Sequence, residues 1–259
     1  AARFKPGHFV AVAVGGENTS MILRRAFALC GAKPRDTLAG TIEFVVAEHG
    51  PGTRWLVQRR AGESLDVVGP LGNPFPIPSA PTRAVLVGGG YGTAPLLPLA
   101  QTLLDAGSEV EFVAGAATAT RLYGELAAKR MVGRVSVTTD DGSAGEKGLV
   151  TDVLAQAIER INAEIVYACG PMGMLQAVGE LAGQRAIRAQ VAVEESMACG
   201  IGVCMTCVLP VRAADGKSRF VRSCVDGPVF DALNVRWSDV GKLPADLLGA
   251  AAMGGVRNG

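Results

Sequence analysis

The cysteines constrain this chain more than any other feature, because four of the six fall in one segment near the carboxyl end. The segment reads Cys199-Gly-Ile-Gly-Val-Cys204-Met-Thr-Cys207, and Cys224 follows it. The two glycines between the first two cysteines permit the positive φ angles with which a tight loop turns its N–H groups inward. Six cysteines in 259 residues are too few for a disulfide framework, so their crowding favours a metal site in a reducing compartment.

The spacing C-x4-C-x2-C…C is that of a plant-type [2Fe-2S] site. Four cysteines also make a closed tetrahedral zinc site, but structural zinc sites usually contain two separated C-x2–4-C pairs, and only Cys204 and Cys207 form one here. We therefore expect a [2Fe-2S] cluster on Cys199, Cys204, Cys207 and Cys224, with zinc as the alternative. The segment from Ser196 to Val211 has no charged side chain, which fits either an exposed docking patch or an inward-packed loop.

Residues 1–78 predict short strands separated by turns. Three stretches rich in Val, Phe, Thr and Trp carry the strand signal, namely Phe9–Val14, Thr41–Ala47 and Trp55–Gln58. Turns between them are expected at Gly50-Pro51-Gly52 and Gly69-Pro70-Leu71-Gly72. Because no long helical pattern interrupts these strands, we expect a small antiparallel barrel, with a proline-dense stiff linker from Pro70 to Pro81 behind it.

From Arg83 onward apolar strands alternate with helix-like stretches. The expected strands are Ala84–Val87, Val110–Ala114, Val135–Thr138 and Ile165–Ala168, and the expected helices are Ala94–Asp105, Leu122–Lys129, Leu149–Arg160 and Met172–Gln184. Such alternation predicts right-handed crossovers and a doubly wound parallel sheet over residues 79–190. Ligands of such sheets bind at the carboxyl ends of the strands.

Residues 191–259 break this pattern and predict a third unit that holds the cluster. A hairpin is expected over Val208–Phe220, with its turn at Asp215-Gly216, and the last 20 or so residues read as a loosely held tail. The predicted fold class is therefore multidomain β plus α/β, with a barrel, a parallel sheet and a carboxyl-terminal [2Fe-2S] domain.

Charge and hydropathy exclude several classes of partner. The formal net charge is +1 and no block of Lys or Arg is present, which argues against nucleic acid and against an anionic membrane surface. The longest apolar stretches fall far short of the roughly 20 residues of a spanning helix, and the first residues do not form a secretory signal. Together with the reduced cysteines, this predicts a cytoplasmic protein.

Two glycine-containing motifs predict a dinucleotide site. The run Gly88-Gly89-Gly90-Tyr91-Gly92-Thr93-Ala94-Pro95 joins an expected strand to an expected helix, where backbone N–H groups can meet a pyrophosphate; by itself it also fits a tight turn. Cys169-Gly170-Pro171-Met172 joins a later strand to a helix in the same way, so both should lie at one edge of the sheet. The alternative for Cys169 is a small buried core residue.

The stretch from Arg24 to Ala28 offers an arginine for a flavin phosphate and an aromatic side chain that can pack on a ring, although it also reads as an ordinary strand. The sequence contains no familiar catalytic motif of a hydrolase. His8 and His49 are the only histidines, and neither belongs to a GxSxG or HExxH pattern. A bound redox cofactor would need few protein acids or bases.

Taken together, these motifs resemble the electron-transfer subunits of dihydroorotate dehydrogenase B, within the ferredoxin-NADP reductase superfamily, over nearly the whole chain. The most specific strings run from Glu194 to Cys207 and from Ser223 to Phe230. The other matches are the flavin motif at Arg25, Ala26, Phe27 and Ala28, the second flavin stretch at Val45, Val46, Ala47, Gly52 and Thr53, the nicotinamide loop at Gly88, Gly89, Gly90, Gly92 and Thr93, and the nicotinamide-side motif at Cys169, Gly170, Pro171 and Met172.

The resemblance implies FAD, a [2Fe-2S] cluster and NAD(H), with electrons exchanged with the FMN of a catalytic subunit that converts dihydroorotate to orotate in pyrimidine biosynthesis. It implies a heterotetramer of two subunits of each kind, α2β2. The family's early Pro-Gly-Gln reads Pro6-Gly7-His8 here, and the strand expected before it has no counterpart in this sequence. Ala28 replaces a hydroxyl residue, which removes a flavin hydrogen bond worth about 1 kcal/mol.

Several alternatives stay open at this point. The choice between NAD and NADP is not determined, because the segment Gly115–Arg121 lacks the ribose-binding acid usual about 20 residues past the glycine loop. The small subunit of an NADH-dependent ferredoxin:NADP oxidoreductase has a similar layout, but an aspartate replaces one cluster cysteine there, whereas Cys199 is present here. A zinc-stabilised non-catalytic adaptor is the third hypothesis.

Overall fold

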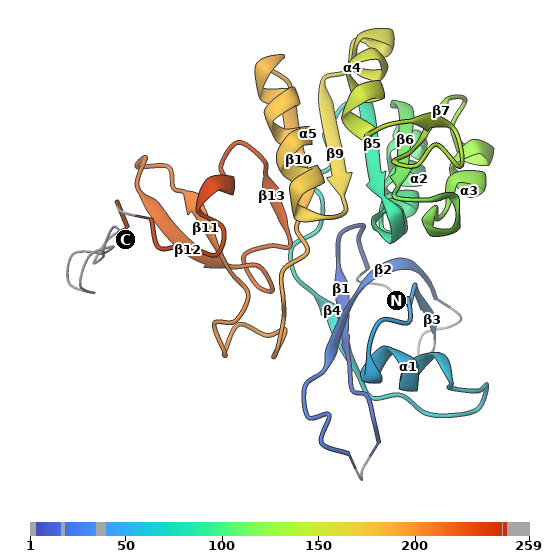
Figure 1. Cartoon of the computed structure of the whole chain (residues 1–259), viewed down its shortest axis with the longest axis vertical. Helices are drawn as coiled ribbons and strands as arrows, with labels where there is room; N and C mark the ends of the chain where they lie inside the picture. Colours follow the sequence, from blue (N-terminus) through green and yellow to red (C-terminus); the bar gives the residue numbers. More distant parts are fainter. Residues whose placement is uncertain (1–3, 17–18, 35–39, 245, 248–259) are drawn as a thin grey trace.

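The computed structural model describes residues 4–16, 19–34, 40–244 and 246–247, and its strands form three sheets in this part of the chain (Figure 1). The amino-terminal sheet is antiparallel, in the order β3-β2-β1-β4. Its strands are β1 (Phe9–Val12), β2 (Arg25–Pro34), β3 (Gly40–Phe44) and β4 (Val67–Leu71). Val10, Val12, Leu29 and Leu56 form its buried core.

One predicted strand in this unit is wrong. Trp55–Gln58 is not a strand, because the chain forms helix α1 over Pro51–Val57. Pro51 suits a first helical turn, and Thr53 Oγ1 accepts hydrogen bonds from the N–H groups of His49 and Gly50 at 2.8 and 3.0 Å. This amino-terminal hydrogen bonding outweighs the strand preference of the Trp and Val side chains, and Leu56 turns inward to the core.

The stretch Gly69-Pro70-Leu71 was also expected to be a turn and the start of the linker, but it belongs to β4, which pairs with β1. Proline lacks the N–H that a central strand needs, and Pro70 is tolerated because β4 lies at the edge of the sheet. The linker to the next sheet therefore begins after Leu71.

The central sheet confirms the predicted doubly wound architecture. Its order is β13-β10-β9-β5-β6-β7-β8, and every neighbouring pair is parallel except β13 and β10. The strands are β5 (Arg83–Gly89), β6 (Glu109–Ala116), β7 (Val135–Thr139), β8 (Glu146–Lys147), β9 (Ile165–Cys169), β10 (Arg188–Ala192) and β13 (Val229–Asp231). The helices are α2 (Leu96–Asp105), α3 (Glu125–Met131), α4 (Val150–Ile161) and α5 (Met172–Gln184).

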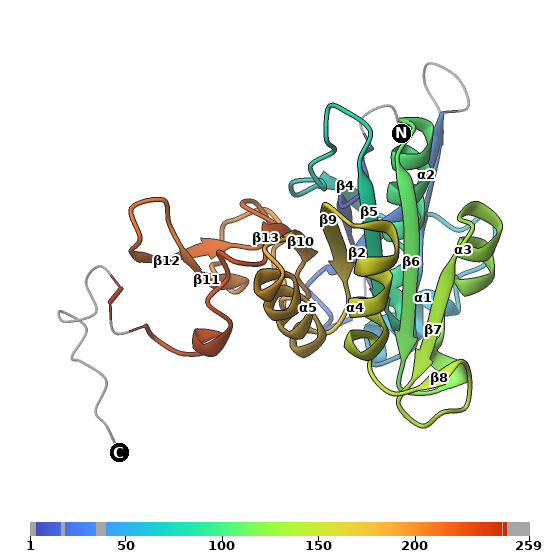
Figure 2. The same cartoon turned by 90° about the horizontal axis from the view of Figure 1, so that it is seen from above.

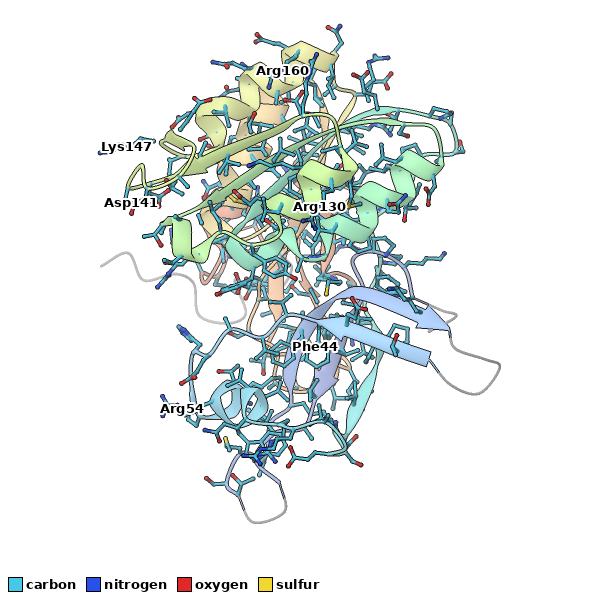
Figure 3. The ribbon with its side chains drawn as sticks, turned by 90° about the vertical axis from the view of Figure 1, so that its right-hand side faces the viewer. Phe44, Arg54, Arg130, Asp141, Lys147 and Arg160 are labelled. Atoms are coloured by element: carbon cyan, nitrogen blue, oxygen red, sulfur yellow. The ribbon has the colours of Figure 1, made fainter. Side chains whose placement is uncertain are left out.

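Helices cover both faces of this sheet (Figure 2). Along β5, Val85 and Val87 pack with α4 and α5, whereas Ala84 and Leu86 pack with α2. One buried charge lies on the first of these faces, where the Glu111 side chain is 1 % exposed and pairs with Arg160 of α4 (Figure 3). The charge is tolerated there because the Arg160 guanidinium donates to both carboxylate oxygens.

The carboxyl-terminal segment confirms the predicted hairpin, which consists of β11 (Val208–Arg212) and β12 (Ser218–Arg222) around the expected turn. The chain then returns to the central sheet as β13. The Asn73 side chain in the linker donates to the carbonyls of Val225 and Asp226, both at 3.0 Å. These bonds hold the last cysteine segment against the antiparallel sheet. Most of the expected tail lies outside the described residues.

No helix in the described ranges combines the length and the hydropathy that crossing a bilayer would require.

Candidate redox site

A pocket of about 230 Å³ lies where all three parts of the chain meet. It is lined by Gly7, Phe9, Ala26, Phe27, Ala28, Val45, Tyr91, Gly92, Ala94, Pro95, Cys169, Gly170, Ala192, Val193, Glu194, Glu195, Met197 and Pro228. The pocket thus brings together the expected flavin motif on β2, the glycine loop after β5 and the motif after β9. Each lies far from the others in sequence.

The flavin motif forms the side of this pocket that the antiparallel sheet supplies. Phe27 stacks on Phe44, with ring centroids 5.2 Å apart and planes inclined by 23°, so its ring is held in place before any ligand binds (Figure 3). Ala26 and Ala28 lie in the same strand, and Val45 follows β3. Of the neighbouring predicted residues, Val46 packs against the barrel core, and Ala47 is only half-buried.

Arg25 and Gly52 were predicted as separate flavin contacts, and the structure brings them together. A Cβ on Gly52 would lie 3.0 Å from Arg25 Nε, so the guanidinium lies directly beside α1 and a larger side chain at position 52 would displace it. The Arg25 guanidinium donates to the carbonyl of Leu23 at 2.6 Å. Its neighbour Arg24 instead pairs with Asp66 at 2.5 Å, and hydrogen bonding to Arg24 lowers the pKa of that carboxyl. Thr53 is engaged in capping α1.

The two nicotinamide motifs lie side by side at the carboxyl edge of the central sheet, as predicted. Gly88 of β5 pairs with Cys169 of β9, and Gly90–Thr93 forms a short 3-10 turn, η1. A Cβ on Gly92 would lie only 2.3 Å from the carbonyl oxygen of Cys169. A Cβ on Gly89 would lie 2.9 Å from Pro171 Cδ. The glycines are therefore required for the close approach of the two loops.

The Cys169 thiol is held neutral. Burial, followed by the nearby charge of Glu194, raises its pKa to about 12. Cys169 is half-buried, packs against the central core and is one of the residues that line the pocket. Met172, predicted with it, begins α5 and packs on the opposite core.

An acidic loop that sequence reasoning missed borders the nicotinamide side of the sheet. Asp140 and Asp141 follow β7, next to the segment after β6 where an acid was sought and not found. The Ala119 N–H donates to Ser143 Oγ at 2.8 Å, and the Ser143 hydroxyl and N–H lower the pKa of the Asp141 carboxyl (Figure 3). The signal was an Asp-Asp-Gly-Ser run directly after an expected strand. The sequence did not reveal that this run lies beside the segment after β6.

The first cysteine loop is built to stabilise negative sulfur. Cys199 Sγ accepts hydrogen bonds from the N–H groups of Ile201, Val203 and Cys204 at 3.5, 3.4 and 3.5 Å. These hydrogen bonds lower the pKa of the Cys199 thiol to about 6, and the bond from the Cys204 N–H has the largest effect. The glycines at 200 and 202 have φ of +72° and +82°, the left-handed values that were expected.

The four sulfurs fall into two neighbouring pairs, in which the pKa of Cys199 responds to Cys204 and the pKa of Cys224 responds to Cys207. Burial, followed by the neighbouring Cys207 thiol, raises the pKa of Cys224 to about 12. In the described part of the chain, no three His, Cys, Asp or Glu side chains surround a common point as ligands of one ion would. Two pairs, with inward N–H groups around the first, fit a cluster that carries two irons.

The loop is exposed on its outer side. The side chains of Ile201, Val203 and Met205 are 55 %, 76 % and 52 % exposed, and Cys204 is exposed as well. Cys207 and Cys224 are buried. Of the two alternatives for this uncharged loop, the structure therefore supports the exposed patch.

Phe9 and Met197 connect the pocket to the cysteines. Both line the pocket, and both pack in the same apolar cluster as the buried Cys207 and Cys224. Sequence reasoning missed them as site residues. Only one layer of side chains therefore separates the pocket from the inner pair of sulfurs.

Comparisons with known proteins agree with this geometry. Residues 194–236 match the family model for the iron-sulfur cluster binding domain of dihydroorotate dehydrogenase B, and residues 86–180 match the oxidoreductase NAD-binding domain. The chain is 39 % identical over 230 residues to the dihydroorotate dehydrogenase B (NAD(+)) electron transfer subunit of Geobacillus thermodenitrificans. It is 40 % identical over 233 residues to that of Bacillus caldolyticus, and each alignment covers 88 % of this chain and 85 % of the relative.

Among solved structures, the chain is similar to one from an NADH-dependent reduced ferredoxin-NADP oxidoreductase, an enzyme of flavin-based electron bifurcation. The TM-score is 0.76 at 32 % identity, over 92 % of this chain and 81 % of that one. A flavohem-like FAD/NAD binding domain of a nitric oxide dioxygenase from Vibrio cholerae shares the fold, with a TM-score of 0.60 at 20 % identity, over 73 % of this chain and 85 % of that one.

Proposed function

Because the chain belongs to the family of dihydroorotate dehydrogenase B electron transfer subunits, we propose that it passes electrons between NAD(H), FAD and a [2Fe-2S] cluster on behalf of a dihydroorotate dehydrogenase partner. It is an oxidoreductase subunit whose chemistry resides in its cofactors. FAD exchanges electrons in pairs with a nicotinamide and singly with an iron-sulfur cluster. The protein binds these groups, orients them and keeps them within reach of one another.

One observation carries this proposal: a single pocket touches the flavin motif, both nicotinamide loops and the side chains that cover the inner cysteines. A flavin ring in it would have Phe27 on the barrel side and the Gly92 and Cys169 backbones on the nicotinamide side. Phe9 and Met197 would separate it from the cluster. Such packed apolar contact keeps water out of the site while leaving the redox groups close.

We assign the binding roles as follows. Arg25 would pair with a flavin phosphate, because its guanidinium lies beside Gly52 of α1 whereas that of Arg24 is engaged by Asp66. The glycines after β5 would admit the pyrophosphate of the nicotinamide cofactor. Cys199 and Cys204 would hold one iron, and Cys207 and Cys224 the other.

The partner would dock over the exposed apolar rim of Ile201, Val203 and Met205. This rim surrounds the outer cysteines, so a redox group of a partner seated on it would approach the cluster directly. We propose that this group is an FMN and that the assembly is an α2β2 heterotetramer. We also propose that the protein works in the cytoplasm, where thiols stay reduced.

A second candidate is the small subunit of a bifurcating NADH-dependent ferredoxin-NADP oxidoreductase, which the structural similarity favours. Cys199 argues for the first candidate, because an aspartate is expected at one cluster position in the second. Affinity purification from the native cell distinguishes the two. A co-purifying FMN protein that oxidises dihydroorotate supports the first, and a large bifurcating subunit supports the second.

The test of the redox assignment is anaerobic purification followed by an absorption spectrum and by iron and acid-labile sulfide analysis. We expect two irons and two sulfides per chain, a yellow-brown colour, and bleaching of the visible spectrum on addition of NADH. A colourless protein that contains zinc would replace this proposal with a zinc-stabilised adaptor.

A further inference from the structure

The Ser223 hydroxyl is left without a partner inside the protein. Ser223 is 0 % exposed, and among the described residues its Oγ is the one buried side-chain polar atom without a hydrogen-bond partner. A buried hydroxyl without a partner costs free energy, so a structure keeps one only where an acceptor is supplied in another way. Ser223 directly precedes Cys224, one of the two buried cysteines.

The strand register places the Ser223 side chain on the same face as that of Cys207. Val208 of β11 pairs with Arg222 of β12, and one step farther the Ser223 N–H donates to the Cys207 carbonyl at 2.8 Å. Residues directly opposite each other in antiparallel strands present their side chains on the same face. The Ser223 and Cys207 side chains are thus neighbours, and Cys207 packs in one buried cluster with Cys224, the residue after Ser223.

We propose that Ser223 donates a hydrogen bond to a sulfur atom at the Cys207–Cys224 end of the bound cluster and thereby raises its reduction potential. This inference rests on the proposed function. Reduction adds one electron, and with it one unit of negative charge, to the cluster. A donor aimed at a sulfur stabilises the more negative form more strongly, which favours reduction. Ser223 is a positioning and tuning residue and not a ligand.

Backbone donors already serve the outer pair. Three N–H groups donate to Cys199 Sγ, whereas at Cys224 the backbone of Gly202 only partly offsets the rise of the pKa caused by burial. A side-chain hydroxyl supplements this backbone group in the buried half of the site, where water does not reach Cys207 or Cys224. The effect of one hydrogen bond is larger there because the surroundings are apolar, with Phe9 and Met197 in the same cluster.

The test is a set of variants of the full-length protein, purified anaerobically with cluster and flavin in place. Ser223→Ala removes the donor, and Ser223→Thr keeps a hydroxyl. Ser218→Ala is the matched control, because Ser218 is a buried serine at the start of β12, the strand that ends directly before Ser223, and its hydroxyl already donates to Asp246 at 2.8 Å. The readouts are iron content, the cluster potential by redox titration with electron paramagnetic resonance, and the coupling of an exchangeable proton to the reduced cluster.

We expect Ser223→Ala to bind iron normally and to lower the equilibrium constant for cluster reduction by about tenfold, which is about 59 mV for one electron. The exchangeable proton coupling should weaken, the flavin potential should stay unchanged, and Ser223→Thr should restore most of the shift. An unchanged cluster potential and proton coupling in Ser223→Ala, with full iron content, would overturn the inference and assign the hydroxyl to a buried water. Absence of iron from the wild-type protein would instead overturn the proposed function.

Discussion

Replacement of Gly92 by alanine tests whether the two nicotinamide loops must touch. The new Cβ would lie 2.3 Å from the Cys169 carbonyl oxygen and 2.8 Å from Gly170 Cα, both backbone atoms that cannot rotate away. To restore ordinary contact of at least 3.4 Å, the loops must separate by about 1 Å. A displacement of this size can reduce a rate about 100-fold, and the overpacking costs about 1–3 kcal/mol of stability.

We therefore expect Gly92→Ala to lower kcat/KM for NADH between ten- and a hundredfold, measured with ferricyanide as electron acceptor, while iron and flavin contents stay normal. Gly133→Ala is the control, because Gly133 lies in the same sheet domain with nothing within 4 Å of its new Cβ, and its activity should not change. A Gly92→Ala protein with wild-type kcat/KM would refute the reasoning. So would an equal loss in both variants.

Three further predictions follow from the same geometry. Cys204→Ser should abolish electron transfer to the partner and leave flavin reduction by NADH largely intact, as stopped-flow spectra would reveal; equal loss of both would contradict the assigned site. Arg25→Ala should weaken FAD binding at least tenfold in equilibrium dialysis, whereas Arg24→Ala should not, since Arg24 is paired elsewhere. Tyr167→Phe should lower the free energy of unfolding by about 1 kcal/mol at pH 8, because the Tyr167 hydroxyl donates a hydrogen bond to the Pro76 carbonyl at 2.8 Å. Burial raises the pKa of this tyrosine to about 12, so the folded wild type keeps its proton while the unfolded chain loses its own above pH 10. The free energy of unfolding of the wild type, measured by urea titration, should therefore fall between pH 10 and 12, and its difference from that of Tyr167→Phe should close. A difference that stays constant with pH would argue against the buried phenol.

Local patterns predicted the parts of this molecule that local physics controls. Alternating strands and helices between Arg83 and Gln184 led to the correct parallel sheet, because a period of hydrophobicity reports which face of each element is buried. The same kind of reasoning failed at Trp55–Gln58. There, hydrogen bonds to Thr53 start a short helix, and strand-forming side chains do not prevent it.

Contacts between distant segments decided the rest. No acid follows β6, whereas Asp140 and Asp141 follow β7, and only the strand order makes those two segments neighbours. In the same way, Phe9 resembles an ordinary core residue in the sequence. The fold places it between the pocket and the buried cysteines.

The sequence by itself determined the chemistry available to this protein, because the spacing of four cysteines and the placing of glycines directly limit which groups a backbone can hold. The tertiary structure alone decided that the expected sites share one pocket, that Ile201, Val203 and Met205 face outward, and that Ser223 lies opposite Cys207. The physical reason is that burial and proximity depend on the packing of segments far apart along the chain, which no local pattern of residues encodes.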